Sequence, residues 1–244
     1  FAGTAFSAAS LAIAIPSAAK VLSWIATTWR SRPRLTTAML FALGFVSLFI
    51  AGGLSGPILA QPILDEYLHN TFFVVAHFHL IMAMAGAFGL FCGLYYWAPQ
   101  IFGRRLDETF GKIHFWGTLF FAYNTFLPMH LTGLASEPRH YAQLQGIAPP
   151  ANALLLATLP LQRHITASAL LLAVFQLPFL LNLALLYRRP KEDPATNPWG
   201  ATTLEWSPTL PPNESPTAHH TPCLYSLHDN TFTPQWEPER QNLT

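Results

Sequence analysis

An apolar run of about 27 residues, 71–97, contains no Asp, Glu, Lys or Arg and constrains the fold more than any other feature. A helix needs roughly 20 apolar residues to cross a bilayer, so the run predicts a membrane-spanning helix. His77 and His79 lie inside it. Because each helical residue turns by about 100°, the two imidazoles are expected to leave opposite faces. One helix could then serve two metal centres, whereas a bond to a backbone carbonyl is the alternative for either histidine alone.

The whole chain has the composition of a membrane protein. Of its 244 residues, 51% are hydrophobic and 10% are charged, whereas soluble domains carry about 25% charged residues. The mean hydropathy is +0.30. A net charge of +1 argues against nucleic-acid binding, which requires a strongly basic surface. Cys92 and Cys223 share no motif spacing, so no disulfide is expected. We therefore expect an all-α, polytopic transmembrane helix bundle.

Five spans are predicted, and they form a bundle over 1–187 that is followed by a polar, Pro-rich tail at 188–244 on the cytoplasmic or matrix side. The fifth span is expected to be interrupted at Arg163 and His164 and to cross mainly from 166 to 187. Basic residues follow the first, third and fifth spans, so the odd spans end inside and the histidine pair lies in the outer half of the third. The spans are about 5–28, 36–59, 71–97, 111–134 and 152–187.

Lys20 lies inside the first span, where a lysine costs on the order of 2.5–3.5 kcal/mol. Ser17 precedes it by three positions, so the hydroxyl and the amine share a helix face. Pro16 loosens the backbone beside them. The pattern predicts a proton relay. Snorkelling of the lysine or a structural pairing is the alternative interpretation.

Two outer loops carry further polar residues. Asp65, Glu66 and His69 precede the histidine pair and could hold a divalent cation or a hydrogen-bond network. Helix capping equally explains Asn70. Arg139, after the fourth span, carries a planar guanidinium that suits carboxylates, although a lone loop arginine is a weak signal.

Together these residues resemble a known family, the haem-copper oxygen reductases of the cytochrome c oxidase type, in the C-terminal half of subunit I. The resemblance covers about 1–206 and is most specific at 68–79, Leu-His-Asn-Thr-Phe-Phe-Val-Val-Ala-His-Phe-His. It implies helices eight to twelve of a twelve-helix bundle in a respiratory membrane, either a bacterial plasma membrane or a mitochondrial inner membrane. The other matching stretches are Ala-Ile-Pro-Ser-Ala-Ala-Lys-Val at 14–21, Leu-Phe-Ala-Leu-Gly-Phe at 40–45, Gly-Gly-Leu-Ser-Gly at 52–56, Lys-Ile-His-Phe at 112–115 and Asn-Pro-Trp-Gly-Ala-Thr-Thr-Leu-Glu-Trp at 197–206.

The resemblance implies roles for the residues inside the spans. His77 would be the proximal ligand of the high-spin, oxygen-binding haem, and His79 an axial ligand of the low-spin haem that feeds it electrons. Phe78 would lie between the two haems. Lys20 and Ser17 would belong to the proton channel that serves the oxygen-binding site.

It also implies roles for the outer loops, with two departures. His69 would match a magnesium ligand, and Arg139 the first of two arginines that bind haem propionates. Asn70 stands where cytochrome c oxidases usually place an aspartate ligand to magnesium, and so resembles the quinol-oxidising branch. His140 replaces the second arginine, which weakens the expected propionate clamp.

The expected function is the C-terminal part of a terminal oxidase that reduces dioxygen to water with electrons from cytochrome c and couples this to proton uptake. The implied cofactors are two haems of the haem A type, a magnesium ion, and a copper whose ligands lie upstream of Phe1. The implied partners are the N-terminal half of subunit I, subunit II with a dinuclear copper, subunit III and membrane lipid. The alternatives are a quinol oxidase, a nitric oxide reductase, which is disfavoured because that relative lacks the channel lysine, and a structural or transport subunit.

Overall fold

The computed structural model describes residues 2–141, 151–191, 198–201 and 206. Within these ranges the regular structure is helical apart from one antiparallel bridge between Thr71 and Pro138, so the all-α prediction is confirmed. The chain divides into two units, Phe1–Pro190 and Lys191–Thr244. The first unit holds helices α1 to α10. Most of the predicted tail, with Cys223, lies outside the described residues.

Four helical segments are long and apolar enough to cross a membrane. The predicted span at 111–134 corresponds to α7 (Glu108–Leu134), which is 27 residues long but less apolar than these four, so its crossing stays a prediction. Shorter helices are α4 (Pro62–Leu68), α8 (Ala151–Ala157) and a 3-10 turn, η3 (Leu186–Arg188). The four segments contain α1 (Ala2–Thr28); α2 (Thr37–Gly53) with α3 (Gly56–Leu59); α5 (Phe72–Phe78), η1 (His79–Met84) and α6 (Ala85–Phe102); and α9 (Leu159–Val174) with α10 (Leu177–Leu185).

Arg163 and His164 interrupt the apolar run of the fifth predicted span but not the helix, because α9 runs through both residues. Their side chains are exposed, so two polar residues here leave the backbone helical. The chain breaks instead at Thr158 and again between α9 and α10. Pro160 and Pro178 lie in the first turns of α9 and α10, where the missing N–H of proline costs no hydrogen bond.

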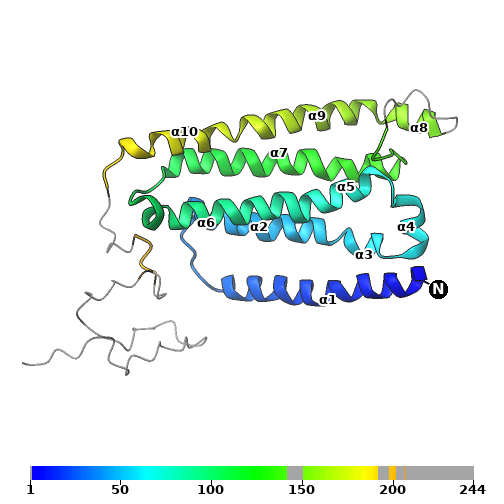
Figure 1. Ribbon diagram of the computed structural model, residues 1–244, viewed down its shortest axis with the longest axis horizontal. Helices are drawn as coiled ribbons and strands as arrows, with labels where there is room; N and C mark the ends of the chain where they lie inside the picture. The colour runs from blue at the N-terminus through cyan, green and yellow to red at the C-terminus, as the bar shows by residue number, and fades with distance from the viewer. Residues whose placement is uncertain (1, 142–150, 192–197, 202–205, 207–244) are drawn as a thin grey trace, which may run out of the picture. The chain divides into compact units, whose positions relative to one another are not determined.

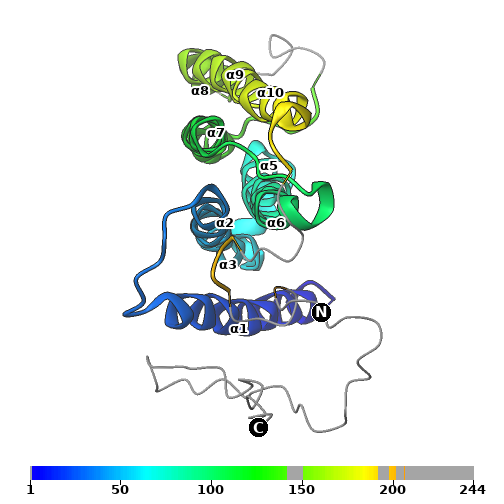
Figure 2. The ribbon, with the colours of Figure 1, turned by 90° about the vertical axis from the view of Figure 1, so that its left-hand side faces the viewer.

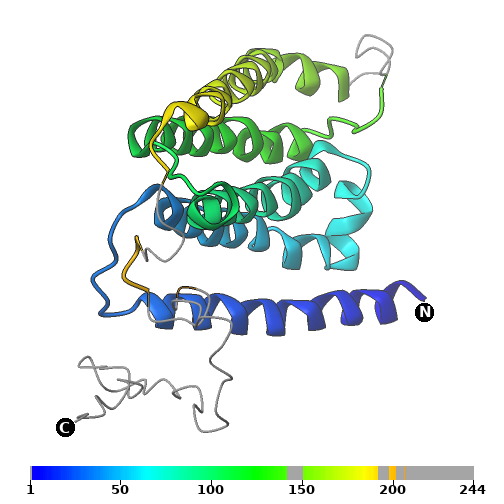
Figure 3. The same ribbon diagram turned by 60° about the vertical axis from the view of Figure 1, so that its left-hand side comes forward.

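The long helices of the first unit lie side by side in the order α1, α2, α6, α7 and α9 (Figures 1 and 2). One end of this unit gathers five helix termini: the end of α1, the start of α2, the end of α6, the start of α7 and the end of α10 (Figures 1 and 3). We call it the basic end, because Arg30, Arg104 and Arg188 lie where α1, α6 and α10 end. The opposite end carries α4 and the start of α5. The membrane side on which the basic end lies stays a prediction.

Aromatic side chains fill the space between α2, α6 and α7. Phe41 is fully buried, and its ring centroid lies 5.0 Å from that of Phe88, 5.6 Å from that of Tyr95 and 5.2 Å from that of Phe115. Gly44 makes this close approach feasible, since a Cβ there would lie 2.6 Å from the ring of Phe88. Large rings opposite a residue without a side chain pack at the density of a protein interior.

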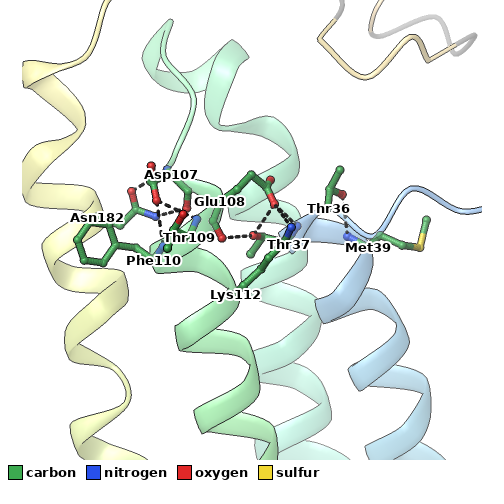
Figure 4. A network of polar contacts seen from close by, with 9 residues as sticks. All are labelled: Thr36, Thr37, Met39, Asp107, Glu108, Thr109, Phe110, Lys112 and Asn182. Carbon is green, nitrogen blue, oxygen red and sulfur yellow. Dashed lines mark hydrogen bonds and ion pairs between the residues drawn. The ribbon is translucent and has the colours of Figure 1, made fainter.

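A polar network fastens the basic end (Figure 4). Asp107 caps α7, since its Oδ1 accepts hydrogen bonds from two N–H groups of the first turn at 2.8 and 3.0 Å. The buried Asn182 of α10 accepts from the Asp107 N–H at 2.8 Å and donates to its carbonyl at 2.9 Å. Glu108 Oε2 accepts from the N–H and the hydroxyl of Thr37, at 2.8 and 2.9 Å. The first turn of α7 therefore joins α2 to α10.

Candidate functional site

The histidine pair lies where an α-helix changes to a π-helix. Thr71 begins α5, because its Oγ1 accepts a hydrogen bond from the Phe73 N–H at 3.2 Å. Thr71, and not Asn70, is therefore the cap. His77 lies in the last turn of α5, and His79 is the first residue of the π segment η1. Single π turns inside α-helices are frequent at functional sites, and the uninterrupted α-helix predicted here contains one.

His77 faces the end of α2. Its Nδ1 lies 2.9 Å from the carbonyl oxygen of Gly52 and 3.0 Å from the hydroxyl of Ser55. That hydroxyl itself donates to the Gly52 carbonyl at 2.7 Å. The Nδ1 atom therefore carries the proton and donates it to the carbonyl, which leaves Nε2 as the basic nitrogen. Gly56 lies beside the Cε1–Nε2 edge of the ring, since a Cβ there would lie 3.2 Å from the His77 Cε1 and 3.8 Å from its Nε2.

A cavity of about 310 Å³ adjoins His77. Ser17 of α1 lines it, and the Ser17 hydroxyl donates to the carbonyl of Ile13 at 2.9 Å. Lys20 is exposed and is not among the lining residues. The structure thus brings one of the two predicted relay residues to the cavity of His77. The lining also includes Ser10, Leu11, Phe49, Gly53, Gly56 and Ile81.

His79 faces α7 instead. Its Nδ1 donates to the carbonyl of Val75 at 2.8 Å, and its ring stacks on that of Phe126 with centroids 5.1 Å apart and planes 8° apart. The ring centroid of Phe78 lies 4.2 Å from that of His79, and Phe78 is 39% exposed. His77 therefore contacts α2 and His79 contacts α7, so the two rings face different neighbouring helices.

The outer loops bring together fewer residues than predicted. His69 is exposed, with Nδ1 3.6 Å from Asp65 Oδ2. Nowhere in the part of the chain that the structure describes do three His, Cys, Asp or Glu side chains form a group that could hold a metal ion, so Glu66 completes no such cluster. The carbonyl of Asn70 accepts a hydrogen bond from the N–H of Arg139 at 2.9 Å. The loop of the predicted magnesium ligand is thereby paired with the loop of the predicted propionate ligand.

The loop after α7 also holds a residue that the sequence analysis missed. Glu137 is only 2% exposed; its Oε1 accepts a hydrogen bond from the hydroxyl of Tyr141 at 3.0 Å, and its Oε2 is buried without a partner. Burial, the Glu137 hydrogen bond and the Glu137 charge together raise the pKa of Tyr141 to about 12. The Nε of Arg139 is likewise buried and unpartnered, whereas His140 is exposed. No local pattern marks Glu137, because a charged loop residue is normally expected to be solvated.

Two other positions escaped the sequence analysis. Phe126 is one of several phenylalanines on α7, and its contact with His79 is visible only once α5 packs against α7. Ser55 could have been noticed, since the Gly-Gly-Leu-Ser-Gly stretch at 52–56 combines a hydroxyl with three glycines. Its glycines predict close helix packing, which they do provide around His77.

Most of the chain matches one protein family. The sequence profile described as Cytochrome C and Quinol oxidase polypeptide I matches residues 1–175. The chain belongs to this family. Members of the polypeptide I family bind haem and copper and are parts of multi-subunit oxidase complexes, and the four apolar helices agree with a multi-pass membrane protein.

Individual relatives support the same assignment. The chain is 41% identical over 207 residues to the cytochrome c oxidase subunit 1 of Thermostichus vulcanus, covering 85% of this chain and 36% of that relative. It is 41% identical over 228 residues to the alternative cytochrome c oxidase subunit 1 of Bradyrhizobium diazoefficiens, covering 91% of this chain and 37% of that relative. The chain therefore spans a little more than a third of the length of these curated polypeptide I relatives.

Proposed function

We propose that this chain is the C-terminal part of the catalytic subunit of a terminal oxidase that reduces dioxygen to water, takes electrons from cytochrome c and couples the reaction to proton uptake. The observation that carries the proposal is the arrangement of His77 and His79, whose rings leave one helical segment toward two different neighbouring helices. Family membership and the names of the relatives support it.

We infer that His77 holds the high-spin haem and His79 the low-spin haem. The donor atoms fit. Each imidazole gives its Nδ1 proton to a backbone carbonyl, of Gly52 and Val75 respectively, which leaves Nε2 for iron. Metal-binding histidines are held in this way in general, because the second hydrogen bond fixes the tautomer and the ring orientation. The cavity of about 310 Å³ beside His77 is at the small end of ligand sites, so the remaining walls would come from the part of the subunit that this chain does not span.

When bound, the haems supply oxygen binding and electron storage. The residues of this chain orient and shield them. The Gly52 carbonyl fixes the plane of His77, and Phe126 fixes the plane of His79. Arg139 offers a buried, unpartnered Nε that suits a haem propionate, with His140 next to it.

Ser17 and Lys20 are proposed to deliver protons to the high-spin site. Ser17 lines the cavity of His77, and Lys20 follows one helical turn toward the basic end. Its exposed ammonium would meet the rest of the subunit in the complete protein. A hydroxyl and an amine on one face of a helix can pass a proton between them through a bridging water.

The finer assignments of cofactors and partners are proposals of the same kind. They comprise haem A, a copper bound by the remainder of subunit I, magnesium at His69, and subunits II and III. Asn70 favours a second candidate, a quinol oxidase, because an amide replaces the expected carboxylate. Turnover of the purified complex with reduced cytochrome c, compared with turnover with a quinol, separates the two donors.

The ligand assignment is tested in the complete oxidase with His77→Leu, His79→Leu and a control, His164→Leu, which changes an exposed histidine of α9. Reduced-minus-oxidised spectra should lose the high-spin haem signal in the first variant and the low-spin signal in the second. The control should keep both. Unchanged spectra in the first two variants would refute the proposal, and a wild-type complex without haem would refute it outright.

A further inference from the structure

The helix that carries the histidine pair is joined at its start to the loop after α7. The Phe72 N–H donates to the Glu137 carbonyl at 2.9 Å, and the Arg139 N–H donates to the Asn70 carbonyl at 2.9 Å. Thr71 and Pro138 form the antiparallel bridge between these two bonds. We call this pairing of 70–72 with 137–139 the clasp.

A second contact between the same two elements lies at Gly133, in the last turn of α7. A Cβ at Gly133 would lie 2.1 Å from the backbone nitrogen and 2.7 Å from the Cα of Phe73. Both atoms are backbone, so no side-chain rotation could relieve the clash, and α5 itself would have to move. The absence of a side chain at Gly133 therefore sets how closely α5 approaches α7.

Side chains hold the clasp from the α7 side. Glu137 is buried, and its Oε1 accepts the hydroxyl of Tyr141. The Tyr141 ring lies 6.3 Å from that of Phe72, across the pairing. The clasp is thus fastened by backbone bonds, by a buried hydrogen bond and by an aromatic contact.

We propose that Gly133 and the clasp are positioning elements that set the pose of His79, a role that rests on the proposed ligation of a haem by His79. His79 lies six residues beyond Phe73, about 9 Å along a helix, and Phe126 lies seven residues before Gly133. The same pair of helices therefore meets at Gly133 and again where His79 stacks on Phe126.

Regular α-helix connects the two meeting points, because α5 is unbroken from Phe72 to Phe78. The π segment, where a change of register could be absorbed, begins only at His79. A displacement of α5 at Gly133 is therefore transmitted to the imidazole of His79. The clasp also gives the loop of Arg139 and the helix of His79 one common anchor.

The test is Gly133→Ala in the complete oxidase, with Gly86→Ala as the matched control. Gly86 is also in a long helix, but a Cβ there meets nothing within 4 Å. We expect Gly133→Ala to change the one-electron equilibrium of the low-spin haem at least threefold, which is about 30 mV at 59 mV per tenfold. The absorption band of the low-spin haem should shift as well, while the haem content of the complex is retained. Gly86→Ala should change neither, and identical potentials in Gly133→Ala and the wild type would overturn the proposal.

A milder pair of variants decides the matter if Gly133→Ala does not assemble. Thr71→Val removes the hydroxyl that caps α5 within the clasp, and Thr36→Val removes the corresponding cap of α2 at the basic end. Thr71→Val should shift the low-spin haem potential in an assembled complex, and Thr36→Val should not. Equal potentials in these two variants would overturn the proposal.

A measurement that needs no haem tests the clasp itself. Partners in an antiparallel bridge have Cβ atoms about 4.5–5.5 Å apart, close to the separation that a disulfide spans. Cysteines introduced together as Thr71→Cys and Pro138→Cys should therefore link on mild oxidation, and mass spectrometry of the digested protein would detect the linked peptides. Absence of the link would refute the clasp. A link in a wild-type background that binds no haem would instead show that the proposed function fails while the clasp stands.

Discussion

The Nδ1 of His77 lies 2.9 Å from the carbonyl oxygen of Gly52, at the end of α2. The last carbonyls of a helix lack the N–H of a further helical turn. The Gly52 oxygen accepts the Ser55 N–H at 3.2 Å and can also accept the imidazole. Ser55 shares the same oxygen and contacts Nδ1 at 3.0 Å. The end of one membrane helix thus orients a side chain of another.

The opposite edge of the His77 ring provides the first prediction. Gly56→Ala would place a methyl group 3.2 Å from Cε1 and 3.8 Å from Nε2. We expect it to crowd the ligand side of the ring and to reduce or shift the high-spin haem spectrum without changing the low-spin one. Gly86→Ala is the control, because a Cβ there would meet nothing within 4 Å and Gly86 does not line the cavity. Optical spectra of the two variants should differ, and matching spectra would contradict the assignment of Nε2.

The stacking of Phe126 on His79 provides the second. Phe126→Leu removes the parallel ring 5.1 Å away, and such ring pairs contribute about 0.5–1.5 kcal/mol. If the whole contribution depended on the oxidation state of the iron, the low-spin potential would shift by about 20–60 mV, which is therefore the upper range expected. Phe121→Leu, whose ring instead faces Phe175 at 5.3 Å, should leave the potential unchanged. A redox titration of both variants checks this, and equal shifts would exclude a specific role for Phe126.

The sequence predicted what depends on local periodicity. The 100° turn per residue predicted different directions for His77 and His79, which contact α2 and α7 respectively, whereas the orientation predicted from the basic residues stays a prediction. The π segment at His79 was not predicted. The burial of Glu137 was not predictable, because it accompanies the pairing of its loop with the start of α5, far away in sequence. Arg163 and His164 interrupt the apolar run of the sequence, but their side chains are exposed and α9 continues through them.

Lys20 provides a prediction about proton delivery. Lys20→Met keeps the length of the side chain but removes the exchangeable proton. In the complete oxidase we expect slower reduction of the high-spin site and about a hundredfold loss of turnover, the lower end of the range for removal of a proton-transfer group. Haem content should be unchanged. Lys112→Met is the control, because Lys112 lies 3.9 Å from Glu108 at the basic end of α7. Normal turnover in Lys20→Met would remove the lysine from the proton path.

The cap of α7 should make stability depend on pH in the acid range. The backbone N–H of Phe110, followed by Arg189, holds the pKa of Asp107 below its ordinary value of 3.8, although burial opposes the shift. A lowered pKa in the folded state means that the stabilisation is complete above the unfolded pKa and is lost as pH falls through the folded pKa. Thermal unfolding in detergent between about pH 6 and pH 2 should show this loss. Asp107→Asn can still cap but cannot titrate, so its profile should be flatter, whereas the exposed Glu66→Gln should follow the wild type.

Asn182 connects α10 to the first turn of α7 within this network and has no exposed surface. Asn182→Leu keeps a similar volume but leaves the N–H and the carbonyl of Asp107 without these hydrogen-bond partners. Leaving a buried polar group unsatisfied costs about 1–3 kcal/mol. We expect a lower free energy of unfolding and earlier release of α10 from α7, measured by denaturant unfolding and by hydrogen exchange at 177–188. Asn124→Leu is the matched control, since Asn124 bonds only to the carbonyl of Phe120 in its own helix. Because Asn182 lies at the basic end, the haem spectra should stay unchanged. Equal unfolding energies for the two variants would show that the polar network does not hold α10.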